Sequence, residues 1–238
     1  MLLCGVLKLV KNGYRYNDIA IITKNLDTYS SIAKVVFDKY NIPIFIDEKK
    51  ELNQNQLAKY ILSIFEVISN NWKYESVFNY LKNSFSNIDI DVVHKLENYC
   101  TKWGIKNNKW LKPWNDEMLE PIRQIIVQEI LEFKDEIYNQ KTFINITKAL
   151  YNFMEKNNIK DKLDKKIERL ESLNEIELAN EYKASYSVII NVLNEIVKIF
   201  GKETTTIDRY KEILKIGLKN INIGEIPARL DQVVMGDI

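Results

Sequence analysis

The sequence predicts a mostly α-helical α/β protein with one small parallel sheet. Two short apolar runs rich in isoleucine, residues 19–23 and 44–46, are typical of buried strands. From about residue 52 apolar residues recur with helical spacing over most of the chain. Only 7 Gly and 4 Pro stand among 238 residues, which favours long helices over a turn-rich sandwich.

The front of the chain predicts a helix, a strand and a second helix. Residues 2–12 place Val6, Leu7 and Val10 on one helical face, and Gly13 stands where a left-handed cap is needed. After the strand, Asp27 is expected to cap a second helix. The predicted core-facing residues of that helix are Ile32, Val35, Val36 and Tyr40.

Pro43 ends the connection to the strand at residues 44–46. Two strands joined by one helix over this distance predict a right-handed crossover and a parallel pair.

The middle of the chain predicts a series of amphipathic helices. Pro121 suits the first turn of one of them, and Thr142 is expected to cap the next. Residues 159–200 keep a helical period up to Gly201, as one very long helix or as two with a break near Asn180. The apolar positions that set the period include Leu57, Ile61, Phe65, Val77, Tyr80, Val92, Leu96, Ile126, Phe133, Ile146, Leu150, Leu163, Ile189, Tyr210 and Leu214.

The helical period stops after Gly224 and Pro227, and residues 230–237 predict a strand that returns to the sheet. A strand cut this early leaves an incomplete edge, so the sequence predicts an internal segment of a larger protein. The expected organisation is a sheet piece at residues 1–51, a helical insertion at 52–222 and a truncated return strand at 223–238.

Composition excludes several classes of protein. A formal charge of +1 argues against a surface wholly committed to nucleic acid or to an acidic membrane. Cys4 and Cys100 form no CxxC pair, so a zinc site or a four-thiolate iron–sulfur site is not expected, and both are interpreted as reduced thiols. No stretch approaches the roughly 20 apolar residues of a membrane span, and no cationic leader precedes the apolar start, so a cytoplasmic protein is expected.

Three parts of the sequence resemble a known family: residues 14–23 together with 41–49, residues 72–82, and residues 227–237. They are similar to the second motor domain of superfamily 1 DNA helicases. More narrowly, they resemble the B subunit of the AddAB-type ATP-dependent helicase/deoxyribonucleases of Gram-positive bacteria.

The resemblance implies that residues 1–51 begin a 2A-like motor domain and that residues 52–222 form a 2B-like helical insertion. It implies a parent that binds DNA and a partner helicase/nuclease A subunit, uses Mg²⁺, ATP and an iron–sulfur cluster, and processes double-strand breaks for recombinational repair. This chain has no GxxxxGK[ST] phosphate loop and too few cysteines for the cluster. We therefore expect a noncatalytic segment with a scaffold and DNA-guiding role, without cofactor, metal or catalytic residues of its own.

A tryptophan- and lysine-rich stretch at residues 103–114 is the first candidate DNA contact. Aromatic faces beside ammonium groups are used to stack bases and to displace counterions from phosphates. The alternative is that the tryptophans anchor the loop while the lysines point to water. The candidate residues are Lys102, Lys106, Lys109, Trp110 and Lys112.

Lys24 and Asn25 follow the first strand at its carboxyl end, the edge where parallel sheets place ligands. In helicases of the resembled family this edge faces single-stranded DNA, so a backbone contact is the second candidate. The alternative is a simple loop start.

Asp47-Glu48-Lys49 matches the (D/E)xK element of Mg²⁺-dependent nucleases, so a self-contained nuclease is an alternative function. Such a site needs another acid on a neighbouring strand, and Asp18 would lie at the opposite edge of a parallel pair. A purely structural helical interaction module is the third hypothesis.

The remaining polar features favour structural roles. His94 has no second ligand near it, and Asp89 and Asp91 suit a helix cap. The mixed charges of residues 160–181 are interpreted as a solvated face.

Overall fold

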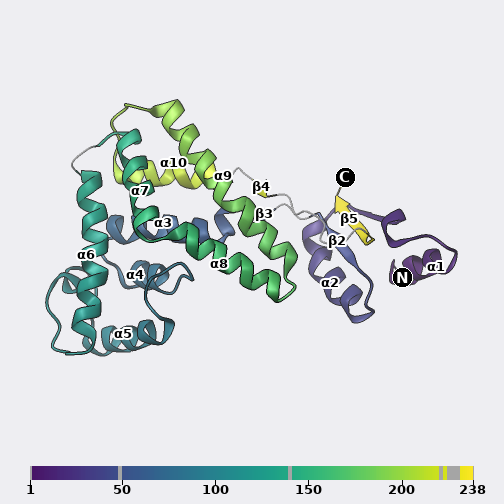
Figure 1. Ribbon diagram of the computed structural model, residues 1–238, viewed down its shortest axis with the longest axis horizontal. Coiled ribbons are helices and arrows are strands. Elements are labelled where there is room, and N and C mark those ends of the chain that lie inside the picture. Colours follow the sequence, from purple (N-terminus) through teal and green to yellow (C-terminus); the bar gives the residue numbers. More distant parts are fainter. Residues whose placement is uncertain (1, 48–49, 139–140, 220–221, 224–230, 238) are drawn as a thin grey trace. The chain divides into compact units, whose positions relative to one another are not determined.

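The computed structural model describes residues 2–47, 50–138, 141–219, 222–223 and 231–237 (Figure 1). Its α-helices are α1 (Leu2–Lys11), α2 (Leu26–Lys39), α3 (Gln56–Ser69), α4 (Tyr74–Leu81), α5 (Ile90–Trp103), α6 (Leu119–Tyr138), α7 (Phe143–Lys156), α8 (Ile159–Ser172), α9 (Ile176–Phe200) and α10 (Ile207–Lys219). The strands are β1 (Ala20–Thr23), β2 (Ile44–Ile46), β3 (Lys50–Glu51), β4 (Asn222–Ile223) and β5 (Val233–Asp237), and short 3₁₀ turns are η1 (Tyr16–Asp18), η2 (Leu52–Gln54) and η3 (Asn107–Leu111).

The predicted fold class is confirmed: the chain is mostly helical and carries a three-stranded parallel sheet in the order β1-β5-β2. Ala20 pairs with Val234, and Phe45 pairs with the same residue from the other side. The returning strand is therefore central, and the expected direct pairing of β1 with β2 is wrong. The expectation that β5 leaves an incomplete edge is also wrong, because β5 pairs with a strand on each side.

One face of this sheet packs against α1 and α2 in a shared hydrophobic core. Residues of β1, β2 and β5 that point to this face meet apolar side chains of α1 and α2. The buried members are Val6, Ile19, Ile21, Leu26, Phe37, Ile42, Ile46, Val233 and Met235. Leu7 and Val10 pack against the same cluster, as the helical spacing predicts, and Gly13 takes the predicted left-handed backbone at φ 96°.

Helix α2 differs from the prediction in its cap and in its buried face. Asn25, not Asp27, is the N-cap, since its side-chain oxygen accepts a hydrogen bond from the Thr28 N–H. Ile32 and Val35, expected in the core, are 60% and 69% exposed. Leu26 and Phe37 face the sheet instead. Both sides of this helix are apolar, so periodicity alone does not identify the side that meets the sheet.

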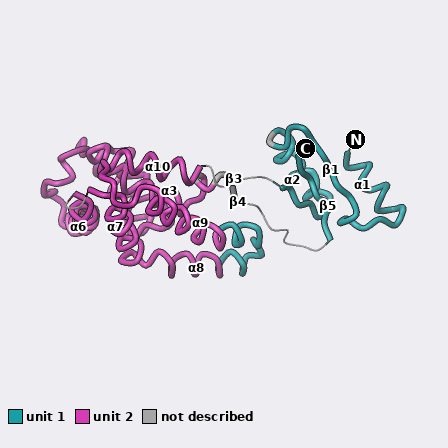
Figure 2. Tube along the Cα trace, turned by 90° about the horizontal axis from the view of Figure 1, so that it is seen from above, with its two compact units in different colours: residues 1–50, 169–181, 222–238 teal, residues 51–168, 182–221 magenta. Residues whose placement is uncertain are grey.

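The structure divides into two compact units, shown in Figure 2. The first contains residues 1–50, 169–181 and 222–238, and the second contains residues 51–168 and 182–221. Residues 169–181, which the sequence analysis placed in the helical insertion, group with the first unit. The assignment of these stretches to 2A-like and 2B-like domains stays a prediction.

Helix α3 runs through the core of the second unit, and most of its residues are buried. Pro121 lies in the first turn of α6, as predicted. Thr142 occupies the predicted N-cap position of α7, but its hydroxyl makes no capping hydrogen bond.

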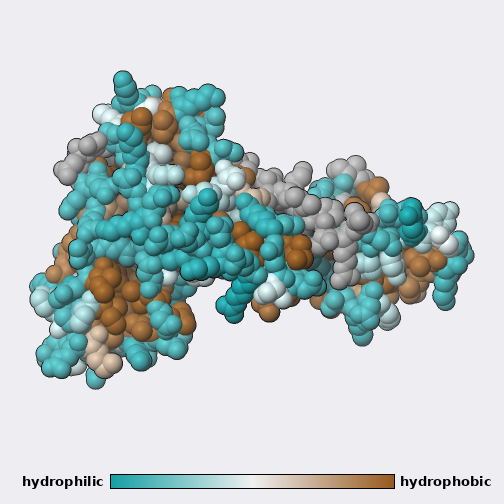
Figure 3. Space-filling model, in the orientation of Figure 1, coloured by the Kyte–Doolittle hydropathy of each residue, from teal (hydrophilic) through white to brown (hydrophobic). Residues whose placement is uncertain are grey.

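The apolar period at residues 159–200 is divided between α8 and α9. The break lies at residues 173–175 rather than near Asn180, because Asn174 adopts the left-handed backbone at φ 61° that ends a helix. Exposed charged residues such as Asp161 cover the outer side of α8, which is hydrophilic in Figure 3, so the predicted solvated face is confirmed for this helix.

A buried polar chain joins several helices of the second unit. The hydroxyls of Tyr60 and Tyr80 lie 3.1 Å apart, and Tyr80 donates a 2.7 Å hydrogen bond to Glu129. Burial raises the pKa of the Glu129 carboxyl above its ordinary value. Lys162, whose pKa is lowered by burial, donates to the Phe85 carbonyl oxygen at 2.7 Å.

Cys4 is exposed and Cys100 is buried, and both are free thiols, as expected. Burial raises the pKa of the Cys100 thiol to about 12. Across the described ranges, no helix is long and apolar enough to cross a membrane.

Candidate nucleic-acid interface

Three of the tryptophans form a buried aromatic cluster in the second unit. Trp110 is 0% exposed, Trp72 2% and Trp114 7%. The ring of Trp110 lies 6.4 Å from that of Trp72 and 4.9 Å from that of Trp114. Trp110 therefore cannot stack on a base, and the anchoring alternative describes this residue and Trp114.

An ion pair between the buried Arg123 and the half-buried Glu120 supports the same loop. Arg123, which is 5% exposed, donates to the carbonyl oxygen of Trp110 at 2.7 Å. It also donates through Nε and Nη2 to the two carboxylate oxygens of Glu120. Those hydrogen bonds from Arg123, with one from the Trp114 backbone N–H, lower the pKa of Glu120 to about 2.

A cleft of about 680 Å³ opens beside this cluster. Its walls are the segment before and at the start of α4 and the segment around η3. The lining residues are Asn71, Lys73, Tyr74, Glu75, Lys106, Asn107, Asn108, Lys109 and Lys112. We call this feature the lysine cleft. It brings together three of the predicted lysines and adds Lys73, which the sequence analysis did not select.

The predicted lysines have different environments. Lys109 Nζ donates to the carbonyl oxygens of Gly104 at 2.9 Å and Trp103 at 3.4 Å, so it caps the end of α5. Lys106 and Lys112 are exposed on the cleft. Lys102 lies outside the cleft lining, and its Nζ is 5.3 Å from the centre of the Trp103 ring. Trp103 itself is 57% exposed.

The second predicted contact lies in the other unit, at the carboxyl end of β1. Lys24 is exposed there. Asn25 uses its side-chain oxygen to cap α2 and its backbone N–H to bind the Thr23 hydroxyl. The structure thus gives Asn25 a local role, and a DNA contact of Lys24 stays a prediction.

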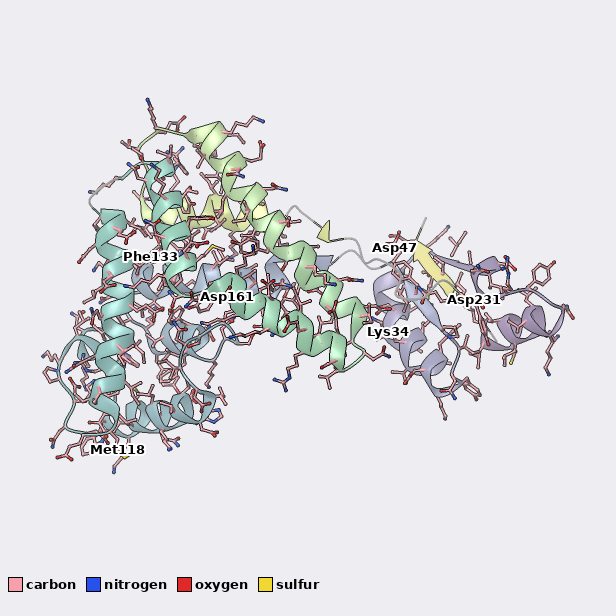
Figure 4. The ribbon with its side chains drawn as sticks, viewed as in Figure 1. Lys34, Asp47, Met118, Phe133, Asp161 and Asp231 are labelled. Atoms are coloured by element: carbon pink, nitrogen blue, oxygen red, sulfur yellow. The ribbon has the colours of Figure 1, made fainter. Side chains whose placement is uncertain are left out.

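The structure does not bring Asp18 to Asp47, the acid of the nuclease alternative. Asp47, labelled in Figure 4, follows β2, whereas Asp18 precedes β1. Because both strands run parallel to β5, these acids lie at opposite ends of the sheet, as predicted. Glu48 and Lys49 lie outside the described residues, as do residues 227–230 of the third resembling segment.

The other polar candidates, Asp89, Asp91 and His94, all lie at the start of α5 or on it. Asp89 caps α5 as predicted, since its carboxylate accepts from the Asp91 N–H at 2.9 Å. His94 is exposed on the same helix. Within the described part of the chain, no group of three or more His, Cys, Asp or Glu side chains could hold a metal ion.

Comparison with known proteins tests the resemblance. A curated protein of Clostridium novyi (strain NT), named as the B subunit of an ATP-dependent helicase/deoxyribonuclease, is 34% identical over 96% of this chain. Proteins of the same name from Alkaliphilus metalliredigens and Clostridium botulinum (strain Hall) are 34% and 38% identical over 98% of it. This chain is similar to a segment of these proteins. The resemblance that was based on residues 14–23, 41–49, 72–82 and 227–237 is confirmed.

The chain spans only 21% to 22% of the length of these relatives. No family model matches it.

Proposed function

We propose that this chain is a noncatalytic segment of a DNA helicase/exonuclease that processes double-strand breaks for recombinational repair. Its role is to act as a scaffold and to guide DNA. The observation that carries the proposal is the alignment of 96% to 98% of the chain with proteins named as the B subunit of an ATP-dependent helicase/deoxyribonuclease.

Two structural features support this role. A parallel sheet with a crossover helix, interrupted in the sequence by a large set of helices, suits a motor-like domain that carries a helical insertion. The lysine cleft gives the second unit a basic surface. Proteins use basic surfaces to bind the phosphates of DNA independently of its sequence. The parent protein, with its partner A subunit, is expected to use Mg²⁺, ATP and an iron–sulfur cluster, and none of these is assigned to this segment.

The test is to incubate the purified chain with labelled duplex and single-stranded DNA in the presence of Mg²⁺ and ATP. We expect binding without cleavage and without ATP hydrolysis. Cleavage that is lost in the variant Asp47→Asn would contradict the noncatalytic role and support the Mg²⁺ nuclease. Absence of DNA binding at low salt would contradict the DNA-guiding role and support a helical protein-interaction module.

A further inference from the structure

We propose that the lysine cleft binds the sugar–phosphate backbone of duplex DNA and does not read or stack its bases. This inference rests on the proposed function, because it names the form of DNA and the residues that hold it.

The charge of the cleft favours a polyanion. Four of its nine lining residues are lysines, and Glu75 is the one acid among them. Three asparagines add amide donors. Lysine and amide donors of this kind make many of the protein contacts to phosphate oxygens, and each neutralised phosphate releases bound counterions.

The two walls of the cleft are fixed to each other. The Asn107 N–H donates to the Trp72 carbonyl oxygen at 2.9 Å, which joins the η3 segment to the segment before α4. Behind this bond, Trp72 and Trp110 stack in the buried cluster. Because the backbone that carries the lysines is already held in place, less conformational entropy is lost when DNA binds.

The aromatic groups that line the cleft or pack behind it are not available for bases; Trp103, which is exposed, lies outside the lining. The indoles of Trp72, Trp110 and Trp114 are buried. Tyr74 is the aromatic residue of the lining, but its ring packs 4.7 Å from that of Phe78 and its hydroxyl donates to Glu97 at 2.9 Å. Single-strand binding proteins depend on exposed aromatic faces, so this cleft suits backbone contacts instead.

The lysines of the cleft divide into two groups. Lys109 is committed to the end of α5 by its hydrogen bonds to carbonyl oxygens. Lys73, Lys106 and Lys112 are exposed and line the cleft from both walls. These three are the residues that we assign to phosphate contact.

The test compares two triple variants that remove the same charge. The cleft variant is Lys73→Ala, Lys106→Ala, Lys112→Ala, and the control variant is Lys148→Ala, Lys160→Ala, Lys165→Ala, which changes exposed lysines of α7 and α8. Binding of a short fluorescent duplex and of its single strand is measured by anisotropy between about 50 and 200 mM salt. Circular dichroism checks that each variant is folded, and the single variant Lys106→Ala replaces the triple variant if that one is not.

We expect the cleft variant to bind duplex at least about tenfold more weakly at low salt, with the slope of log K against log salt reduced by about 3. For Lys106→Ala alone the expected reduction is about 1. The control variant should bind like the unchanged chain.

Equal losses in both triple variants would mean that only net charge matters, and the inference would be wrong. If the cleft variant still binds duplex DNA, the inference about the lysine cleft is wrong. The DNA-guiding role would then depend on another surface of the chain. Tighter binding of single-stranded DNA that disappears in Tyr74→Leu would show stacking and contradict the backbone mode. If the unchanged chain binds no DNA, both the inference and the proposed DNA-guiding role fail.

Discussion

The backbone N–H of Asn107 donates a 2.9 Å hydrogen bond to the carbonyl oxygen of Trp72. Both residues have left-handed backbone, at φ 55° and φ 57°, a conformation that is unfavourable for most residues with side chains. The buried tryptophan cluster supports these conformations. This one bond places Lys73 beside the lysine-rich loop, although the two are far apart in the sequence.

Trp110→Ala is expected to destabilise the chain by about 3–5 kcal/mol, the range for removing a large buried aromatic side chain. The indole is 0% exposed and packs against other aromatic rings, so its loss leaves a cavity. Urea unfolding followed by circular dichroism measures the change. Trp103→Ala is the matched control: that side chain is 57% exposed, and its loss should cost less than about 1 kcal/mol. Similar losses in both variants would contradict the anchoring role.

The pair formed by Arg123 and Glu120 predicts a stability change in acid. Hydrogen bonds from Arg123 lower the pKa of Glu120 to about 2 from an ordinary value of 4.5. A lowered pKa in the folded state contributes stability above pH 4.5 that is lost as the pH falls towards 2. The Glu120→Gln variant should be less stable at neutral pH by about 1–3 kcal/mol, and its disadvantage should shrink in this acid range. Unfolding measured at several pH values checks this, and a disadvantage that does not change with pH would argue against the pair.

Tyr80→Phe should cost about 1–3 kcal/mol, because Glu129 would lose its 2.7 Å hydrogen bond while staying largely buried. The pKa of Glu129 is raised by burial, so ionising it works against the folded state. The sign is therefore opposite to that of Glu120: stability should fall as the pH rises through the raised pKa of Glu129. The Glu129→Gln variant should lack this fall. If stability fell in the same way over this pH range in Glu129→Gln as in the unchanged chain, the assignment would be contradicted.

The same substitution should have opposite effects at two helical glycines. An added methyl at Gly217 in α10 would come within 2.8 Å of Val192 Cγ1, so Gly217→Ala should destabilise by about 1–3 kcal/mol. At Gly5 in α1 no atom beyond the adjacent residues and the backbone of the helix itself lies within 4 Å of the added methyl, and Gly5→Ala should stabilise by about 0.5–1 kcal/mol. Thermal unfolding of both variants measures the signs. Stabilisation by Gly217→Ala would show that α9 and α10 are packed less closely than described.

Local features of the fold could be predicted from the sequence. Gly13 ends α1 with positive φ, Asp89 caps α5 and Pro121 lies in the first turn of α6, because each depends on a residue and its close neighbours. The strands at residues 19–23 and 44–46 and the series of helices follow from spacing alone.

Choices between equivalent local patterns could not be predicted. Ile32 and Leu26 both lie on apolar sides of α2, and only packing against the sheet placed Leu26 in the core. Asn174 is only a weak signal for the end of a helix. The apolar period continues across this residue and therefore concealed the break.

The sequence by itself determined the helix and strand content, the family resemblance and the lysine-rich stretch at residues 103–114, since these depend on residue type and short spacing. Only the tertiary structure decided that β5 lies between β1 and β2, that Trp110 is buried, and that Lys73 joins Lys106 and Lys112. The physical reason is that strand order, burial and the composition of a cleft depend on contacts between distant segments. Their energies are set by packing and hydrogen bonds that no local pattern contains.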